Sequence, residues 1–393
     1  MRIGVLTLHD SVNYGAVLQA HALCSHLKSL GHQAIVLDRR RMPDLSLRVP
    51  SVRPGGYRLL GLWPVRAYDG IEEACCRVER TERFLKERVG LSSFRFHDWA
   101  DAPADLGIDL MIVGSDQVWN AGNLNPEDYL LPSVCGNVPG IAYAASIGMP
   151  EFPEDQVEVF RRGFRRFRAI GVREREAADM VRALGAEATQ VVDPVLLGGR
   201  EVWNALPCPK DNHSAKVFAY FLAEDFDALF KPLGDFARAR QTRVNFYVDW
   251  LCRRRTNRLG RWLRNRRWMR RIARIGVDLR LDAGPAEFVR DLAAADVVVS
   301  NSYHALMFSL LFGKEVRIVL PSHPVRQKMN ARLREFEDMV TGGPLVVPDI
   351  SAALESLDSN VHVAVRQDCL AARIDASRKW LGTALKECAG GST

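Results

Sequence analysis

The chain has 393 residues, of which 47% are hydrophobic and 26% charged, and 54 Lys and Arg against 47 Asp and Glu give a net charge of +7. A single core stops growing at roughly 250–300 residues, so we expect two domains. The apolar content excludes a disordered chain, and the dispersed glycines and prolines exclude a fibrous one.

The amino-terminal residues and the cysteines favour a reduced, cytoplasmic protein. No apolar run reaches the roughly 20 residues that cross a bilayer, and the first residues lack the apolar segment of roughly 7–15 residues that a signal peptide needs. The eight cysteines are scattered and form no Cys-x-x-Cys pair. This spacing argues against a disulfide framework and a structural zinc site, so we expect no metal.

Strand and helix alternate over residues 1–205. Strands are predicted at 3–8, 34–38, 110–113, 141–145, 169–172 and 190–192, and helices at 17–30, 72–89, 154–167 and 174–184. Strands that are apolar along their whole length, separated by helices, predict a parallel sheet covered on both faces.

The alternation restarts after a predicted linker at 206–214. Strands are predicted at 217–222, 244–248, 297–300 and 316–320, and helices at 226–240, 259–275, 286–294 and 303–312. We therefore expect an α/β protein of two Rossmann-like doubly wound domains, 1–205 and 206–345, that face a cleft. A helical tail, 346–393, is expected to pack back across them.

The whole basic excess lies in one of these predicted helices and the residues before it. Residues 253–274 contain 11 arginines and no acid, which leaves 43 basic against 47 acidic residues, a net charge of −4, elsewhere. A basic amphipathic helix with tryptophans fits an anionic membrane surface, although its apolar stripe can instead pack on its own domain. The predicted membrane- or acceptor-docking residues are Arg261, Trp262, Arg264, Arg267, Trp268 and Arg271.

Ligands of doubly wound sheets bind beyond the carboxyl ends of the strands, and four such loops carry unusual polar residues. In the first, Asn13, Tyr14 and Gly15 precede a helix. A glycine there brings backbone N–H groups close to a ligand, and the helix start favours an anion. The alternative is a tight turn without a ligand.

The second loop follows the strand 110–113. Small residues followed by acidic, amide and aromatic ones suit sugar or phosphate recognition, although Asp116 and Asn120 can simply cap backbone groups. The predicted substrate-binding residues here are Gly114, Ser115, Gln117, Trp119 and Asn120, beside Asp116.

The third and fourth loops offer a cation and a histidine. Arg173 can bind a carboxylate or phosphate with its forked guanidinium, or form a helix-start ion pair with Glu174. Ser302 is a predicted N-cap, which places Tyr303 and His304 in the first turn of a helix. We expect Ser302 and Tyr303 to be substrate-binding residues. A histidine there should stay neutral until an anion binds and can then shuttle a proton; the alternative is a histidine satisfied by local backbone.

The motifs in these loops resemble the polysaccharide pyruvyl transferase family. The likeness is carried by NYGAVLQAHAL from Asn13, VGSDQVWN from Val113, GVRE from Gly171 followed by DPVLL, and SNSYHALMFSLLFGKEV from Ser300. Their order and spacing match over about residues 1–320. The family's late motif usually reads Ser-Phe-His-Gly, where this chain has Ser302-Tyr303-His304-Ala305.

The resemblance implies a two-domain fold of the GT-B type and a ketal pyruvyltransferase. Such enzymes transfer pyruvyl from phosphoenolpyruvate, the donor substrate, to two sugar hydroxyls and release phosphate, and they need no other cofactor. The acceptor would be a lipid-linked or polymeric glycan of the cell envelope or an exopolysaccharide, met at the inner face of the plasma membrane. Within this reaction we expect His304 to be the acid, Asp116 the base, and Arg173 an anion ligand.

Two other functions compete with this interpretation. A nucleotide-sugar-dependent glycosyltransferase can share the architecture, but it needs a carboxylate pair for uracil and ribose in the second domain, and the sequence offers no convincing one. A polyanion binder using the arginines would bind any duplex with a steep salt dependence and leaves the loop motifs unexplained. We therefore expect no nucleic-acid partner.

Overall fold

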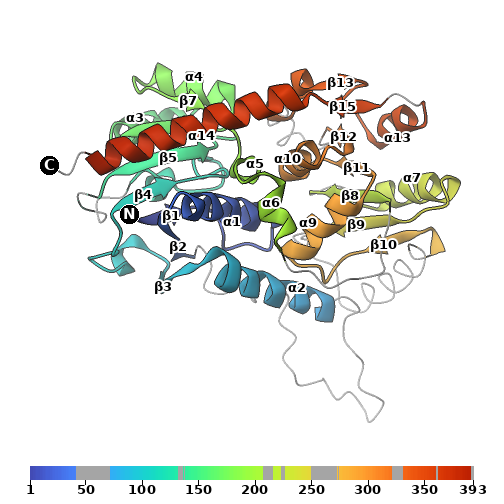
Figure 1. The fold of residues 1–393 in the computed structure, drawn as a ribbon, viewed down its shortest axis with the longest axis horizontal. Helices are drawn as coiled ribbons and strands as arrows, with labels where there is room; N and C mark the ends of the chain where they lie inside the picture. Colours follow the sequence, from blue (N-terminus) through green and yellow to red (C-terminus); the bar gives the residue numbers. More distant parts are fainter. Residues whose placement is uncertain are drawn as a thin grey trace, which may run out of the picture.

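The computed structural model describes residues 1–40, 71–131, 136, 138–206, 216–222, 226–248, 272, 274–320, 331–359 and 362–390. These residues form two parallel α/β sheets side by side, each with helices on its faces (Figure 1). The expected fold class, two Rossmann-like doubly wound domains, is confirmed.

The first sheet has seven parallel strands in the order β3-β2-β1-β4-β5-β6-β7. Its order reverses between β1 and β4, which makes the loops after these two strands the place where a ligand is expected. The strands are β1 (Arg2–Leu6), β2 (Gln33–Arg39), β3 (Leu91–Phe96), β4 (Leu110–Val113), β5 (Gly140–Ala145), β6 (Ala169–Val172) and β7 (Thr189–Gln190).

The second sheet repeats this winding in the order β10-β9-β8-β11-β12-β14, with its reversal between β8 and β11. Because β14 belongs to this sheet, the second domain extends beyond the predicted boundary at 345. The strands are β8 (Val217–Phe221), β9 (Val244–Val248), β10 (Val277–Leu279), β11 (Val297–Ser300), β12 (Glu315–Val319) and β14 (Val346–Val347), and β13 (Val340–Gly342) pairs separately with β15 (Val363–Val365).

Helices cover both sheets and follow the apolar spacing of the sequence. In the first domain they are α1 (Tyr14–Ser29), α2 (Ile71–Phe84), continued by a wider turn at Leu85–Val89, α3 (Val157–Phe164), α4 (Arg175–Ala183), α5 (Pro194–Leu197) and α6 (Gly199–Asn204). In the second they are α7 (Phe226–Ala239), α9 (Pro285–Ala294), α10 (Tyr303–Phe312), α12 (Ala331–Arg334), α13 (Ile350–Asp358) and α14 (Gln367–Gly390). Short 3₁₀ turns lie at Trp99–Asp101, Pro126–Tyr129, Glu154–Gln156 and Glu337–Met339.

A continuous apolar core joins the two domains around the start of α1. The Tyr14 ring stacks on Phe288 of α9, with 4.4 Å between ring centroids, and meets Tyr220 and Tyr247 edge-on. Its hydroxyl donates a hydrogen bond to the Ala283 carbonyl oxygen at 2.7 Å. The guanidinium of Arg77, from α2, lies 4.2 Å from the same ring centroid. Tyr14 therefore fixes the first domain against the second.

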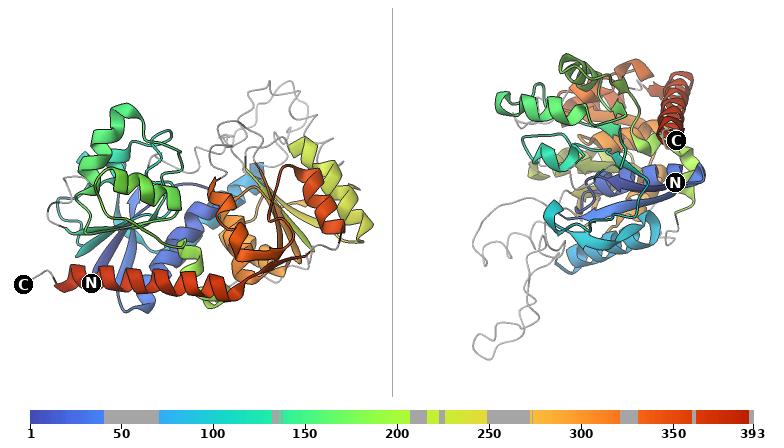
Figure 2. Two further views of the ribbon diagram at one scale, coloured as in Figure 1. Left: turned by 90° about the horizontal axis from the view of Figure 1, so that it is seen from above. Right: turned by 90° about the vertical axis from the view of Figure 1, so that its left-hand side faces the viewer.

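The last helix, α14, runs along both domains (Figure 2). Its Ser377 Oγ accepts a hydrogen bond from the Val192 backbone N–H at 2.9 Å. Trp380 packs so closely against Gly171 that a methyl group on that glycine would lie 2.8 Å from its ring. The helix thus supports β6 and the segment that follows β7.

Some sequence predictions fall outside these residues. Most of the predicted helix 259–275 and most of the linker 206–214 lie outside the described residues, and so do all six predicted docking residues, Arg261, Trp262, Arg264, Arg267, Trp268 and Arg271. In the described part of the chain, no helix combines the length and the apolarity needed to span a bilayer.

Candidate active site

The starts of α1 and α10, one from each domain, meet at the two reversal points of the sheets. A methyl group on Gly15 would lie only 2.1 Å from Nδ1 of His304, so the imidazole packs directly on the backbone of that glycine. Ser302 caps α10 through a hydrogen bond from the Ala305 N–H at 3.4 Å, as the sequence predicts. The His304 side chain is therefore held at the domain boundary, with about 10% of its surface exposed.

Asp193 connects the site residues of both domains. One carboxylate oxygen, Oδ1, caps α5 by accepting the Val195 N–H at 3.0 Å. The other, Oδ2, accepts hydrogen bonds from Ser115 Oγ at 3.2 Å and Arg173 Nη1 at 3.3 Å, and lies 3.6 Å from Nε2 of His304. The carboxylate is fully buried. Three of the four predicted loops thus converge on this one oxygen.

The pair Asp193-Pro194 by itself predicts a structural role, at the end of a strand where the chain turns. That role is present, because Asp193 is the N-cap of α5 with Pro194 at the first helical position. An N-cap leaves the second carboxylate oxygen available, but neither spacing nor residue type shows which groups reach it. The contacts of Asp193 with Ser115, Arg173 and His304 depend on tertiary structure.

Arg173 is buried among three carboxylates. Its Nε donates to Glu174 Oε1 at 3.3 Å, and its Nη1 lies 3.3 Å from Asp193 and 4.0 Å from Asp116. Burial opposes the charge, but Glu174, Tyr303 and these two aspartates raise the pKa of Arg173 above its ordinary value. Its Nη2 is buried without a hydrogen-bond partner among the described residues. Arg173 therefore forms the helix-start ion pair with Glu174 and still has an unused donor, Nη2.

Tyr303 and Glu174 hold this guanidinium in place. The ring of Tyr303 lies 4.3 Å from the guanidinium carbon of Arg173, a cation–π contact in a buried setting. Burial raises the pKa of Tyr303 well above its usual value, so the hydroxyl stays neutral. Ser146 donates a hydrogen bond to the Glu174 oxygen that Arg173 uses. Tyr303 acts here on Arg173, where the sequence predicted a substrate contact.

The loop after β4 is shaped by a close backbone approach. A methyl group on Gly114 would lie 2.3 Å from the Tyr143 carbonyl oxygen, so only glycine fits. Asp116 has a φ of 67°, and its carboxylate accepts the Gln117 N–H at 2.9 Å. With 17% of its side chain exposed, Asp116 is the more accessible of the two aspartates at the site. This is compatible with the predicted role as a base.

Four other predicted contacts serve the protein itself. Trp119 is fully buried and donates to the Tyr129 carbonyl oxygen at 3.0 Å. Asn120 is also buried and donates to Gln117 Oε1 at 3.2 Å. Asn13 caps α1 by accepting the Gly15 N–H at 2.9 Å. Trp119, and Tyr14 in the core described above, are both buried, which argues against the predicted ring contacts with a substrate.

At the reversal point of the second sheet, Asn301 bonds the backbone. Its Oδ1 accepts the Leu222 N–H at 2.7 Å, and its Nδ2 donates to the Leu222 carbonyl oxygen at 3.1 Å. The carboxyl ends of β8 and β11 are thereby joined by one side chain.

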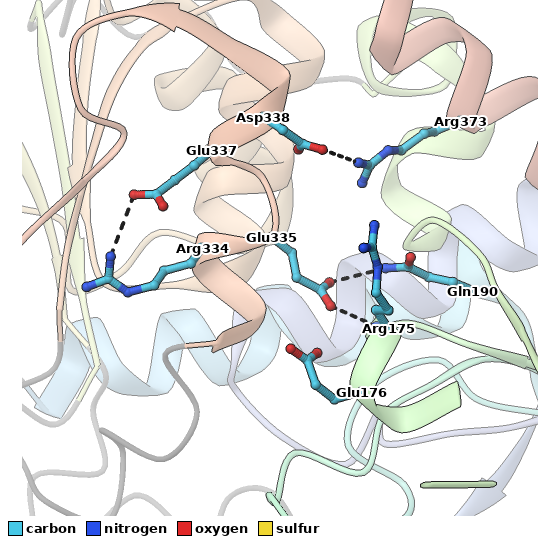
Figure 3. A pocket seen from close by; sticks show the side chains of 8 residues that line it. All are labelled: Arg175, Glu176, Gln190, Arg334, Glu335, Glu337, Asp338 and Arg373. Carbon is cyan, nitrogen blue, oxygen red and sulfur yellow. Dashed lines mark hydrogen bonds and ion pairs between the residues drawn. The ribbon is translucent and has the colours of Figure 1, made fainter. Parts of the chain in front are cut away.

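A pocket of about 340 Å³ opens where α4 meets the second domain (Figure 3). It begins two residues after Arg173 and is lined by charged and amide side chains from both domains. These residues are Arg175, Glu176, Gln190, Arg334, Glu335, Glu337, Asp338 and Arg373. The described residues contain no cluster of three or more His, Cys, Asp or Glu that could hold a metal ion.

Solved structures that match this chain over most of its length share little sequence with it. UDP-N-acetylglucosamine 2-epimerase from Rickettsia bellii has 11% identity and a TM-score of 0.49, with 99% of this chain and 97% of that chain covered. UDP-GlcNAc 2-epimerase from Neisseria meningitidis has 9% identity and a TM-score of 0.47, with 98% and 100% covered. MurG from Acinetobacter baumannii has 11% identity and a TM-score of 0.40, with 96% and 95% covered.

At the level of sequence, no curated protein matches the chain significantly. The family description polysaccharide pyruvyl transferase matches residues 13–323, a range that includes Gly15, Asp116, Arg173, Asp193 and His304. Because this match covers more than half of its length, the chain belongs to the polysaccharide pyruvyl transferase family.

Proposed function

We propose that this protein transfers the pyruvyl group of phosphoenolpyruvate to two hydroxyls of a sugar in a cell-envelope or exopolysaccharide glycan. One observation carries the proposal: His304 of one domain and Arg173 of the other meet at Asp193, within the residues that match the family. A proton carrier and a cation beside two helix starts are the groups that an anionic enol donor requires.

The anion is better accommodated on the histidine side than around Arg173. Phosphoenolpyruvate carries nearly three negative charges, and the Arg173 guanidinium already faces Glu174, Asp193 and Asp116. The starts of α1 and α10 favour negative charge, and His304 lies between them. We therefore assign the phosphate to this side, with Arg173 contributing through its unpartnered Nη2.

The reaction balances with one acid and one base. Protonation of the methylene carbon by His304 turns the enol carbon into an oxocarbenium-like centre, which the first sugar hydroxyl attacks while Asp116 accepts its proton. Phosphate then leaves, and the second hydroxyl closes the ketal. The two sugar hydroxyls lose two protons in total. One replaces the proton that His304 gave to the methylene carbon, and the other leaves with phosphate. Asp193, which contacts no substrate atom in this scheme, orients His304.

Incubation of the protein with phosphoenolpyruvate and lipid-linked glycans tests the proposal. We expect phosphate release together with the mass gain of one pyruvate ketal on the glycan. Phosphate release without that mass gain would contradict the transfer step. Absence of both products across a panel of envelope glycans would contradict the proposed function.

The competing glycosyltransferase hypothesis is tested by ligand binding. Asn301 bonds the backbone at the reversal point of the second sheet, the place where a doubly wound domain binds a nucleotide. We therefore expect phosphoenolpyruvate, and not UDP, to raise the melting temperature. Stabilisation by UDP alone would favour the glycosyltransferase.

A further inference from the structure

Glu335 of the second domain binds the start of a helix in the first. It lies between α12 and the 3₁₀ turn at Glu337–Met339, and its Oε1 accepts the backbone N–H of Arg175, the first residue of α4, at 2.7 Å. Its Oε2 accepts a hydrogen bond from Gln190 Nε2 at 3.2 Å (Figure 3). One carboxyl group thus contacts two segments of the other domain.

The start of α4 lacks a cap of its own. In the described chain, the N-cap residue Glu174 makes no side-chain capping bond, because its carboxylate binds Ser146 and Arg173. The first N–H groups of a helix have no partner within the helix and are satisfied from outside. Glu335 provides that partner from the opposite domain.

Phe336, the residue that follows Glu335, contacts the ring that packs on Arg173. Phe336 packs edge-on against Tyr303, with 5.9 Å between ring centroids. Tyr303 in turn lies 4.3 Å from the guanidinium carbon of Arg173. Glu335 and Phe336 together therefore contact the helix that follows Arg173 and the ring that supports its guanidinium.

We propose that Glu335 is a positioning residue, which docks the second domain on the start of α4 and thereby sets Arg173 and Glu174 against His304. Its kinetic consequences rest on the proposed function, but the docking itself does not. Closure of the two domains and assembly of the site are then one event, because the same backbone segment carries Arg173, Glu174 and the N–H that Glu335 binds.

The charges around Glu335 make this contact sensitive to pH. Glu174, Arg175 and Glu176 face it from α4, Arg334, Glu337 and Asp338 from its own segment, and Arg373 from α14. Arg373 pairs with Asp338 at 2.8 Å and Arg334 lies 3.8 Å from Glu337. Burial first, and then a hydrogen bond with Glu176, raise the pKa of Glu335 from 4.5 to about 8.

The direction in which docking depends on pH follows from this rise in the pKa of Glu335. The docked carboxyl holds its proton more tightly than an undocked one, so docking takes up a proton. Docking is strongest below the ordinary pKa of 4.5, weakens as the pH rises towards about 8, and changes no further above that value. The variant Glu335→Gln stays neutral and keeps an oxygen for the Arg175 N–H and an amide donor for Glu176, while the Gln190 amide turns to present its oxygen in place of its NH2 group.

Three variants test the proposal: Glu335→Gln, Glu335→Ala and, as control, Glu337→Ala in the same segment. Backbone hydrogen exchange of the peptide that begins α4, measured at one pH, reports docking without any enzymatic reaction. Loss of a helix cap costs about 1 kcal/mol, so we expect exchange about fivefold faster in Glu335→Ala. Glu335→Gln and Glu337→Ala should retain the wild-type protection. Wild-type protection in Glu335→Ala would overturn the proposal.

Kinetics provide the second readout. With phosphoenolpyruvate and a glycan acceptor, kcat of Glu335→Ala should fall about fivefold while Glu335→Gln restores it. The glutamine variant should also flatten the decline of kcat between about pH 5 and pH 8. An unchanged pH profile in Glu335→Gln would contradict the role in closure. If the wild-type protein transfers no pyruvyl, the proposed function fails, and hydrogen exchange still decides the docking.

Discussion

The Oδ2 atom of Asp193 receives Ser115, Arg173 and His304 at distances of 3.2 to 3.6 Å. A single oxygen cannot offer an ideal bond to all three, and the imidazole is the partner at the longest distance. A ligand that draws Arg173 away through Nη2, which has no hydrogen-bond partner among the described residues, would therefore leave Asp193 freer to bind His304. Through this competition for Asp193, binding of phosphoenolpyruvate would change the orientation of His304, the proposed acid.

Replacement of His304 tests the acid role. We expect His304→Ala to lower kcat by ~10²–10⁴-fold, the usual contribution of one general acid, without loss of fold. His362→Ala is the matched control, because that imidazole is 74% exposed and bonds Glu315 at 3.0 Å. Steady-state kinetics and circular dichroism check both variants. Near-wild-type turnover in His304→Ala would contradict the assignment.

Gly15 offers a test that leaves the histidine in the sequence. A methyl group there would lie 2.1 Å from His304 Nδ1, so Gly15→Ala should displace the imidazole and reduce kcat as His304→Ala does. The double variant should lose no more than His304→Ala alone, since both changes remove the same group. Gly382→Ala, where no described atom lies within 4 Å of the added methyl, is the control. Additive losses in the kinetic cycle would refute this coupling.

At the scale of elements, the contact of α1 with the second domain depends on Tyr14. Burial raises the pKa of Tyr14 to about 12, so its hydroxyl remains a donor to Ala283 over the physiological range. Tyr14→Phe should lower the free energy of unfolding by about 0.5–1.5 kcal/mol, the net value of one buried hydrogen bond. Urea denaturation measures this loss. Since the Tyr14 hydroxyl bonds Ala283, we expect KM for phosphoenolpyruvate not to change; a large rise in KM would support a substrate contact by that hydroxyl.

Elements with strong local signals were predictable from sequence. The strand Leu110–Val113, at the centre of its sheet, is predicted by its continuous apolar residues. The start of α10 is predicted by the N-cap residue Ser302. The strands β3, β10 and β14 escaped prediction. They are outer strands of their sheets, two of them are only two or three residues long, and β3 is only partly buried, which gives no continuous apolar run.

The site was predictable as a set of loops, and less so as a set of contacts. The chain order places Arg173 and His304 at strand ends, where doubly wound sheets bind ligands. The roles of Asp193 and Glu335 depend on contacts with residues that are far away in the sequence. The residues next to Asp193 and Glu335 in the sequence do not indicate these contacts. The burial of Trp119 and Tyr14 was not predictable either, because an aromatic residue in a polar motif has the same sequence signal whether its ring faces solvent or the core.

At the scale of the whole molecule, charge is divided between two parts. Without residues 253–274 the chain carries a net charge of −4, and that segment carries +11. A body of negative charge is repelled by anionic lipid, so any attraction to such a surface must come from the segment. We propose that it holds the enzyme at the inner face of the plasma membrane, near a lipid-linked acceptor.

Liposome sedimentation tests this location. Replacement of Arg264, Arg267 and Arg271 with glutamine should abolish binding to anionic vesicles, because each basic residue contributes about 1 kcal/mol at such a surface. Activity on a soluble acceptor should remain. Replacement of Arg161, Arg165 and Arg182, which lie in or next to α3 and α4, is the control for charge alone. Equal loss of binding in both variants would contradict a dedicated docking segment.

The course of α14 bears on how the protein is made. Its Ser377 bonds Val192, 185 residues earlier in the chain, and its Trp380 covers Gly171. During synthesis residues 1–205 leave the ribosome long before α14 exists, so the apolar surface that α14 covers stays open until this helix emerges. A chain that ends before α14 would expose this apolar surface, which lies next to Arg173 and Asp193. The surface would then be accessible to chaperones and proteases. Docking of α14 and support of the candidate site would thus be checked at one surface.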